Sequence, residues 1–309
     1  MSRGRAAIVW RARIAVAALA VLAGCGLLAP PEPPARIVDA IPGAEPLPGP
    51  VPFGPRSGAN GSALVPPFPG YELAWHDEFD GVALDTTRWT AMDRPWKGGV
   101  STPDAIEVKD GVLTIRTWDD ASGAHLTGHL GTYPGKFEAT YGYFEARIRF
   151  HDSPGMWCSF FLYPPTYGQP IGDWGTAGVE IDTVEHRVVD GGGFDNSDLV
   201  QFGLNWDGFG ADWKMEHQVV GLPGRTRLYG EWRTYSTLWT PEGYVFYVDE
   251  VPLWSSSAAL SHAATDLYLT CEVGDGGWAG SVPAGGYGSR DASSTWMDAD
   301  WVRVWQLAP

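Results

Sequence analysis

Charged side chains are scarce in this sequence, and basic side chains are the scarcest. Asp, Glu, Lys and Arg make up 19% of the 309 residues, and 21 Lys and Arg stand against 37 Asp and Glu, which gives a formal net charge of −16. A nucleic-acid-binding protein needs a basic surface to replace the counterions of the phosphates. The composition therefore argues against a nucleic-acid partner. It also makes an anionic polysaccharide a less natural partner, although a local basic patch can override the net charge.

Long hydrophobic runs are missing too, apart from one run near the N-terminus, from Ile14 to Gly24. This run is too short for a comfortable transmembrane helix, but it follows four arginines and so matches a signal peptide. Its end, Leu22-Ala23-Gly24-Cys25, resembles a bacterial lipobox. We expect a signal peptide over residues 1–24 and a lipid on Cys25, which would anchor the protein to a membrane outside the cytoplasm. The alternative is an ordinary signal peptide with an incidental cysteine and a secreted product.

Cysteine is rare, with three residues in the whole chain. Apart from Cys25, only Cys158 and Cys271 remain, and both fall in segments with the composition of strands. Outside the cytoplasm they could form a disulfide bond. The sequence does not give the distance between their Cα atoms, so a disulfide and two buried free thiols both remain open.

Proline, glycine and tryptophan are abundant instead, with 25, 40 and 16 residues. Residues 25–69 are dominated by Pro, Gly and Ala, a composition that cannot build a packed core and is typical of a linker. Residues 70–309 are rich in aromatic residues and show neither an internal repeat nor a second break. We therefore expect one folded domain over residues 70–309, and a monomer.

The sequence pattern of residues 70–309 predicts β-strands. Residues 144–150 are apolar at every second position, which is the period of a half-buried strand. Residues 112–116 follow the turn signal Asp110-Gly111, and residues 239–248 read as a strand, a turn and a second strand. Residues 301–305 form another strand, and no useful helical pattern follows the signal peptide. Many short antiparallel strands joined by turns predict an all-β fold, a β-sandwich or jelly roll.

Three carboxylates lie close together in Gly178-Val179-Glu180-Ile181-Asp182-Thr183-Val184-Glu185-His186. In a regular strand Glu180 and Asp182 share one face, whereas Glu185 points to the other face. One inserted bulge residue would return Glu185 to the face of Glu180. We expect such a bulge. His186 should then face away from Glu185, into the core.

Acids gathered on one surface repel each other, so one or more should have a raised pKa. Cleavage of a glycosidic bond needs this combination: one carboxylate attacks the anomeric carbon while a protonated partner donates to the leaving oxygen. We expect Glu180 to be the nucleophile, Glu185 the general acid/base, and Asp182 the residue that orients Glu180 by a hydrogen bond. On this segment alone, a calcium site and a solvated acidic strand remain alternatives.

The sequence resembles glycoside hydrolase family 16, the group of laminarinases, lichenases and agarases. Its signature is Glu-x-Asp-x-x-Glu in the bulged form, which Glu180, Asp182 and Glu185 match. Five further segments resemble family segments in the same order: residues 75–81, 141–147, 155–157, 276–280 and 300–304. The resemblance implies a jelly roll of two curved antiparallel sheets with an open concave cleft. It further implies internal cleavage of a β-linked polysaccharide, with β-1,3- or mixed-linkage β-glucan favoured, and retention of configuration without a catalytic cofactor.

The resemblance also implies binding residues and a structural calcium ion. The calcium ligands would be Glu78, the carbonyl of Gly111, and Asp300. Five tryptophans are candidates for stacking on sugar rings, with the sandwich core as the alternative position for each; they are Trp157, Trp206, Trp213, Trp232 and Trp278. Of these, Trp157 and Trp278 match cleft positions of the family. Asn205 would bind a sugar hydroxyl near the scissile bond, unless it is a turn residue.

Other functions fit the same sequence. A transglycosylase would differ only in resolving the covalent intermediate with a sugar instead of water. A glycan-binding module without activity would normally lack one of the three acids, which are all present here. A calcium-dependent structural protein would ignore glycans.

Overall fold

The computed structural model describes residues 64–222, 227–274 and 276–309. The expected signal peptide, Cys25 and nearly all of the expected linker lie outside these ranges. Within them, helical structure is limited to the short helix α1 (Trp174–Ala177) and the 3₁₀ turn η1 (Pro103–Ala105). None of the helices in these ranges has the length and apolar character needed to span a membrane.

The larger sheet contains eleven of the described strands. Nine follow one another in the order β16 (Val251–Ser256), β15 (Gly243–Val248), β14 (Arg233–Thr240), β9 (Gly142–Phe150), β18 (Thr295–Leu307), β6 (Val112–Asp119), β7 (His125–Thr127), β4 (Gly99–Ser101) and β3 (Arg94–Trp96). In addition, β1 (Tyr71–Asp77) pairs with β18, and β5 (Ile106–Lys109) pairs with β6. These neighbours run antiparallel, except that β4 and β7 are parallel.

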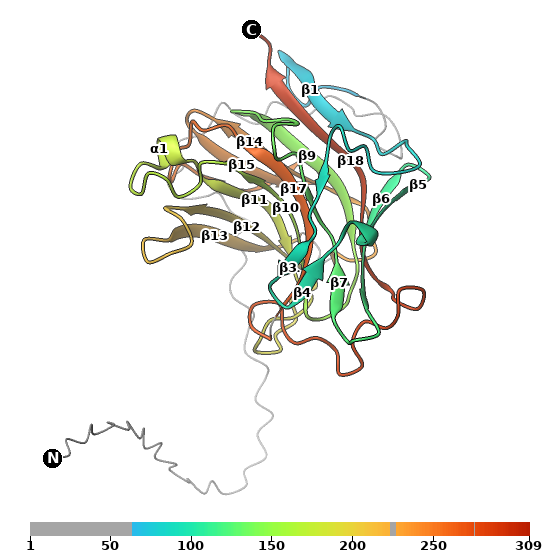
Figure 1. Ribbon diagram of the computed structural model, residues 1–309. Coiled ribbons are helices and arrows are strands. Elements are labelled where there is room, and N and C mark those ends of the chain that lie inside the picture. Colours follow the sequence, from blue (N-terminus) through green and yellow to red (C-terminus); the bar gives the residue numbers. More distant parts are fainter. Residues whose placement is uncertain (1–63, 223–226, 275) are drawn as a thin grey trace, which may run out of the picture. The chain divides into compact units, whose positions relative to one another are not determined.

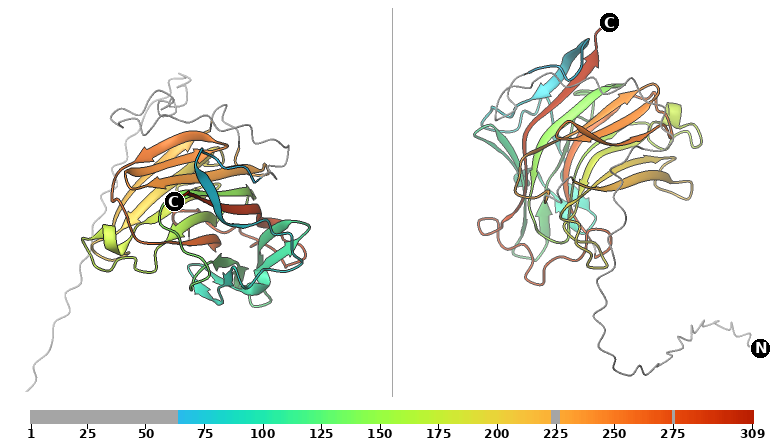
Figure 2. Two further views of the ribbon diagram at one scale, coloured as in Figure 1. Left: turned by 90° about the horizontal axis from the view of Figure 1, so that it is seen from above. Right: turned by 180° about the vertical axis from the view of Figure 1, so that it is seen from behind.

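The smaller sheet contains seven of the described strands and carries the acidic segment. Its order is β13 (Lys214–Gly221), β12 (Leu199–Trp206), β11 (Glu180–His186), β10 (Met156–Tyr163), β17 (Asp266–Val273), β8 (His129–Gly131) and β2 (Thr90–Ala91). The two sheets form two layers, with β14 and β15 of the larger sheet packed over β11 and its neighbours (Figures 1 and 2). The predicted β-sandwich is therefore confirmed.

Local sequence signals set several of these strands. Asp110 and Gly111 both have positive φ and join β5 to β6, which is the conformation that an Asp-Gly hairpin turn requires. Alternation in residues 144–150 places Phe144, Ala146, Ile148 and Phe150 in the interior. In β15, Tyr244 and Phe246 are buried, as are Tyr247 and Val248, because neighbouring elements cover both sides of this strand. The pattern read from the sequence thus matches the strands that form.

The hydrophobic core lies between the two sheets. Apolar side chains from both layers meet there, including Phe144 and Phe246 of the larger sheet and Phe160 and Phe202 of the smaller sheet. Full burial of a large apolar side chain contributes about 1.5–3 kcal/mol each. One face of the smaller sheet thus packs against the larger sheet, and its opposite face can carry polar side chains.

A disulfide bond connects two neighbouring strands of the smaller sheet. Cys158 of β10 and Cys271 of β17 lie opposite each other in the strand register, with 4.1 Å between their Cα atoms, and their sulfurs are bonded. Both residues belong to the buried core. Of the two possibilities that the sequence left open, the structure has the disulfide.

Replacing both cysteines with alanine should lower the stability of the domain. The bond joins residues 113 positions apart, so it restricts the unfolded chain and should contribute about 2–4 kcal/mol. For a domain of this size we expect the melting temperature of Cys158→Ala/Cys271→Ala to fall by about 5–15 °C, measured by circular dichroism. The matched control is wild-type protein refolded with a reductant, which keeps both sulfur atoms. A variant with the same melting temperature as the oxidised wild type would contradict this expectation.

Candidate active site

The acidic strand β11 contains the bulge that its spacing predicts. Asp182 lies opposite Gly203 of β12, whereas Glu185 lies opposite Gln201, so three steps along β11 match two steps along β12. The register with β10 shifts at the same place. The extra residue lies between the acids: Thr183 reaches the other sheet, where its hydroxyl is 2.8 Å from that of Thr237, and Val184 is in the core.

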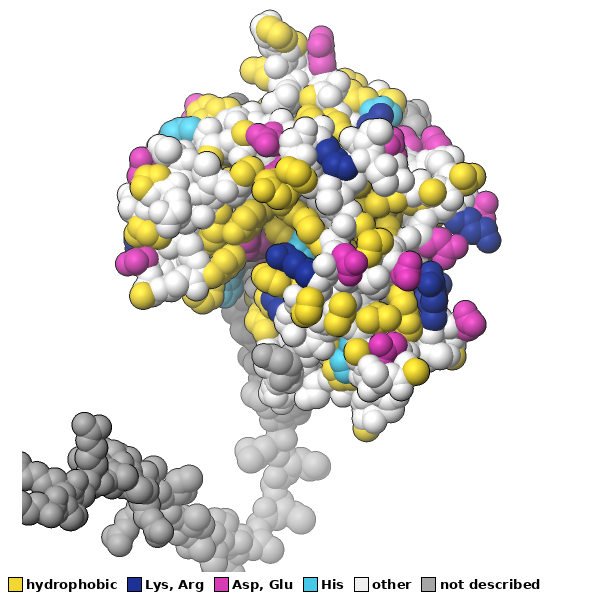
Figure 3. All heavy atoms as spheres, viewed as in Figure 1, with side chains coloured by type: hydrophobic (Ala, Val, Ile, Leu, Met, Phe, Trp, Pro, Cys, Tyr) yellow, Lys and Arg dark blue, Asp and Glu magenta, His cyan; other side chains and the backbone are white. Residues whose placement is uncertain are grey.

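The bulge brings all three carboxylates to the side of the smaller sheet that faces away from the core. Asn205 and Gln201 lie four positions apart on β12, so they share one face. Asn205 contacts Glu180 and Asp182, and Gln201 contacts Glu185. Figure 3 shows a hollow with hydrophobic walls, acidic side chains at its bottom and Lys, Arg and His side chains beside it. The three acids therefore meet on one recessed surface.

Gly203 makes room for the central acid. It lies between Gln201 and Asn205 on the same face of β12, directly opposite Asp182. A Cβ atom at this position would come within 2.5 Å of Asp182 Oδ2, a contact that real side chains do not make. Glycine is therefore required here for the carboxylate of Asp182 to lie flat against the neighbouring strand.

Asn205 connects the first two acids. Its Nδ2 donates to Glu180 Oε1 at 3.1 Å and to Asp182 Oδ2 at 2.9 Å. Both amide hydrogens of Asn205 thus point to the acids, and its binding of a sugar hydroxyl stays a prediction. The hydrogen bond expected between Asp182 and Glu180 stays a prediction as well. Asn205 therefore holds Glu180 and Asp182 at a fixed spacing.

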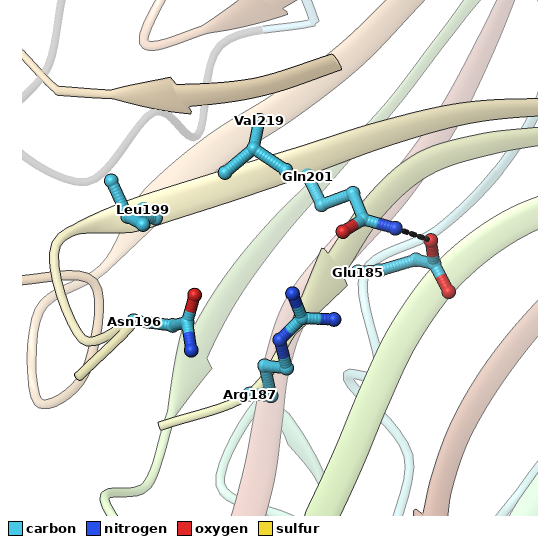
Figure 4. A pocket seen from close by; sticks show the side chains of 6 residues that line it. All are labelled: Glu185, Arg187, Asn196, Leu199, Gln201 and Val219. Atoms are coloured by element: carbon cyan, nitrogen blue, oxygen red, sulfur yellow. Dashed lines mark hydrogen bonds between the residues drawn. The ribbon is translucent and has the colours of Figure 1, made fainter. Parts of the chain in front are cut away.

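Glu185 is held by a different pair of donors. Trp157 Nε1 donates to its Oε1 at 2.9 Å, and Gln201 Nε2 donates to its Oε2 at 2.9 Å. Figure 4 shows Gln201 reaching Glu185 from the next strand, with Arg187 and Asn196 below them around the same small pocket. Both oxygens of Glu185 are thus fixed, which sets the direction in which this carboxyl group can exchange a proton.

Burial raises the pKa of all three acids, and neighbouring carboxylates raise those of Glu180 and Asp182 further. Burial, together with the charges of Glu185 and Glu272, raises the pKa of Glu180 to about 8. Burial raises the pKa of Glu185 to about 7, although the hydrogen bonds from Gln201 and Trp157 oppose this rise. The pKa of Asp182 is raised well above its usual value by burial and by both glutamates.

The three acids lie close enough together to titrate as one interacting cluster. Loss of the charge on a neighbouring acid favours the carboxylate form of Glu180. A double displacement at a glycosidic bond uses the form in which Glu180 is ionised and Glu185 is protonated. Because the pKa of Glu180 is about 8 and that of Glu185 about 7, this form is most populated between about pH 7 and 8.

Trp157 and Trp278 lie beside Glu185, but not as open platforms. Their ring centres are 4.4 Å apart; Lys97 Nζ lies 3.1 Å from the ring centre of Trp157, and the guanidinium carbon of Arg187 lies 3.7 Å from that of Trp278. A lysine nitrogen and a second indole at these distances cannot share one face of Trp157. The order of the stack is therefore Lys97, Trp157, Trp278, Arg187. The flat faces of both rings thus contact protein side chains, and Trp157 orients Glu185. Sugar stacking on Trp157 and Trp278 stays a prediction.

Trp206 does not reach the acidic face. The strand β12 continues regularly through it, so Trp206 takes the side of Phe202 and Leu204 and packs against the core. Trp206 is half-buried at this position, and its binding of substrate stays a prediction. His186 is buried on the core side as predicted, with its ring stacked on Phe150 at 4.5 Å between ring centres.

The residues expected to bind calcium are engaged elsewhere. Glu78 receives two hydrogen bonds from Arg303, at 2.8 and 2.7 Å, and Asp300 pairs with Arg147 at 2.5 Å. Gly111 lies in the β5–β6 turn, next to the side chain of Asp80. A calcium ion would have to displace both arginines, so the residues as placed do not fit it. Calcium binding there stays a prediction from the resemblance.

Several residues of the site could not be found from the sequence. Lys97 lies in the turn between β3 and β4, where it pairs with Glu272 of β17, and Trp96 donates to the same carboxylate at 2.9 Å. Glu272 lies opposite Trp157 in the register of β17 with β10. No motif marks Lys97, Gln201 or Glu272, and only the strand pairing brings them to the acids.

Comparison with known proteins agrees with this geometry. A family model described as "Glycosyl hydrolases family 16" matches residues 97–303, well over half of the chain. The chain belongs to glycosyl hydrolase family 16.

Among similar proteins, the keratan-sulfate endo-1,4-beta-galactosidase of Sphingobacterium multivorum is 27% identical over 253 residues, which are 77% of this chain and 56% of that protein. The endo-1,3-1,4-beta-glycanase EglC of Rhizobium meliloti is 29% identical over 250 residues, which are 78% of this chain and 46% of that protein. The chain thus spans about half the length of these two relatives.

Solved structures of other proteins share this fold. The endo-beta-1,3-glucanase of Pyrococcus furiosus aligns with a TM-score of 0.61 and 20% identity, over 77% of this chain and 95% of that chain. The laminarinase of Rhodothermus marinus aligns with a TM-score of 0.61 and 23% identity, over 77% of this chain and 98% of that chain. The jelly roll implied by the resemblance is confirmed by this likeness.

Proposed function

We propose that this protein is an extracytoplasmic, retaining endo-glycosidase that cleaves a β-linked polysaccharide, with β-1,3- or mixed-linkage β-glucan as the first candidate. The observation that carries the proposal is the bulge in β11. It gathers Glu180, Asp182 and Glu185 on one recessed face, where separate donors orient the two glutamates. A structural or purely binding surface would not need three mutually repelling acids with raised pKa values.

The proposed reaction is a double displacement. The carboxylate of Glu180 attacks the anomeric carbon, and the bond to the glycosidic oxygen breaks while Glu185 gives that oxygen its proton. A covalent glycosyl-enzyme results. Glu185, now a carboxylate, takes a proton from water, and the water oxygen displaces Glu180 from the anomeric carbon. Two inversions at one carbon give net retention, and Glu185 regains its proton.

The substrate class rests on the relatives and on the charge of the chain. The printed names of similar proteins include an endo-1,3-1,4-beta-glycanase, a glucan endo-1,3-beta-glucosidase and a keratan-sulfate endo-1,4-beta-galactosidase. The net charge of −16 favours a neutral glycan among these. The location outside the cytoplasm is supported by the N-terminal sequence, and by the disulfide between Cys158 and Cys271, since such bonds persist in oxidising compartments.

A glycan panel tests the proposal. We expect protein spanning residues 70–309 to release reducing ends from laminarin or lichenan, and to shorten the polymer before small products accumulate. Agarose, galactan and keratan sulfate belong in the panel, because family 16 relatives differ in substrate. Mass spectrometry of the products follows, since oligosaccharides longer than the substrate would identify a transglycosylase. Binding without release of reducing ends from any glycan would refute the proposal.

A further inference from the structure

The loop between β12 and β13 brings an exposed tryptophan to the acidic cluster. Trp213, the last residue before β13, has 45% of its surface exposed. Its indole Nε1 donates to Asn205 Oδ1 at 3.0 Å. The amide nitrogen of Asn205 in turn donates to Glu180 and Asp182. A continuous chain of hydrogen bonds therefore runs from the surface to two of the three acids.

This chain has a single consistent direction. An indole N–H can only donate, and carboxylates can only accept while they are ionised. The amide of Asn205 therefore has to present its oxygen to Trp213 and its nitrogen to the acids. Turned by 180°, the amide would place its oxygen against Glu180 and Asp182, where it would repel them, and its nitrogen against the indole N–H. The N–H of Trp213 thus favours the same orientation of the amide as the ionised carboxylates do.

The loop holds Trp213 in place from both ends. Asp207, directly after β12, is buried; it accepts from the backbone nitrogen of Gly172 at 2.7 Å and pairs with Lys214 Nζ at 2.6 Å. Lys214 directly follows Trp213. The ring of Phe209 lies beside that of Trp213, with 6.1 Å between ring centres. Trp213 is therefore fixed by contacts of its own loop and not by the acids alone.

We propose that Trp213 is a positioning residue, whose indole N–H locks Asn205 in the orientation that donates to Glu180 and Asp182. The inference rests on the proposed function, because Glu180 is the proposed nucleophile. Since the indole is partly exposed, water competes for its N–H in the free protein. A glycan that covers the indole would exclude this water and strengthen the lock as the substrate binds.

The effect on Glu180 has a defined sign. The hydrogen bond from Asn205 favours the ionised form and lowers the pKa of Glu180, so its loss would raise this pKa further. The nucleophile would then ionise only at higher pH. On an activated aryl glycoside, whose leaving group does not need the proton of Glu185, the acid limb of the pH–rate profile would therefore move upward. The other titratable groups that face Glu180 keep their positions; they are Asp182, Glu185, Glu272, Lys97, Tyr163 and Tyr167.

The test compares Trp213→Phe with the wild type and with Phe194→Leu. Phenylalanine keeps an aromatic face but has no N–H, so we expect kcat to fall about 3- to 10-fold with a smaller change in KM. On the activated aryl glycoside, the acid limb should move up by about half a pH unit or more. Phe194 is an exposed aromatic residue in the loop between β11 and β12 and is neither one of the acids nor one of the contacts that hold Trp213, so Phe194→Leu should leave the pH profile unchanged. An unshifted profile in Trp213→Phe, or an equal shift in Phe194→Leu, would overturn the inference.

A second readout does not depend on the substrate. In wild-type protein, the NMR signal of the Trp213 indole N–H, identified by its loss in Trp213→Phe, should move as the acids titrate near pH 8, because the pKa of Glu180 is about 8. In Asn205→Ala the signal should no longer follow this titration. If no glycan is cleaved, the proposed function fails, and the titration still decides the inference. A signal insensitive to pH in the wild type, or equally sensitive in Asn205→Ala, would reject it.

Discussion

Replacing Glu180 with glutamine should reduce glycan cleavage by about 10⁴- to 10⁶-fold, the range seen when a covalent nucleophile is removed. Glutamine has nearly the same shape and can still accept the hydrogen bond from Asn205 through its Oε1. It has no negative charge and cannot form the glycosyl-enzyme. Reducing-end release at saturating substrate gives the rate, and circular dichroism verifies the fold.

The matched control makes the same chemical change elsewhere. Glu107 is exposed on β5, in the larger sheet, so Glu107→Gln should retain full activity. A sharper test supplies azide to Glu180→Ala with a substrate whose leaving group needs no proton. Azide entering the space of the lost carboxylate should attack the anomeric carbon from the side opposite the leaving group and give an α-glycosyl azide. A β-glycosyl azide, or high residual turnover without azide, would show that Glu180 is not the nucleophile.

Replacing Glu185 with glutamine should have the second-largest effect, a loss of about 10²- to 10⁴-fold on natural glycans. The loss should be much smaller for an aryl glycoside with a good leaving group, because its departure needs no proton. For this substrate the covalent intermediate should accumulate, since the base that activates water is missing. Intact-protein mass spectrometry would detect the added sugar. Equal losses on both kinds of substrate would contradict the role of general acid.

The same variant tests the pH dependence. Burial raises the pKa of Glu185 to about 7, so the group stays protonated at lower pH and loses its proton as pH rises through 7. Bond cleavage uses protonated Glu185 together with ionised Glu180, whose pKa is about 8. Wild-type activity on natural glycans should therefore be highest between about pH 7 and 8 and decline above this range. With an activated substrate, Glu185→Gln should lack this decline. A basic limb at the same pH in both proteins would assign the limb to another group.

The bulge in β11 was predictable because a strand has a period of two. Glu180 and Asp182 share a face automatically, and Glu185 can join them only if one residue is inserted between. The spacing of the three acids along the sequence was therefore enough to predict the bulge. The Asp110-Gly111 turn and the alternation of residues 144–150 were predictable for the same reason, since both depend only on neighbouring residues.

The residues that contact the acids could not be predicted, because the pairing of the strands and the paths of the loops bring them there. Gln201 meets Glu185 only because the bulge shifts the pairing of β11 with β12. Lys97 reaches Trp157 from a turn far away in sequence. The packing of Trp206 against the core was not predictable, because the sequence does not say which side of β12 faces the core. The arginines that pair with Glu78 and Asp300 lie on β18 and β9, and these ion pairs could not be predicted from the sequence either.

The stack of Lys97, Trp157, Trp278 and Arg187 joins four segments that are distant in sequence, right beside Glu185. Two indoles this close couple their electronic transitions, and the flanking cations perturb both rings. The circular dichroism signal of this indole pair should therefore depend on the surroundings of Glu185, the proposed general acid. Near-ultraviolet circular dichroism can follow the arrival of a glycan in this part of the cleft without any added label.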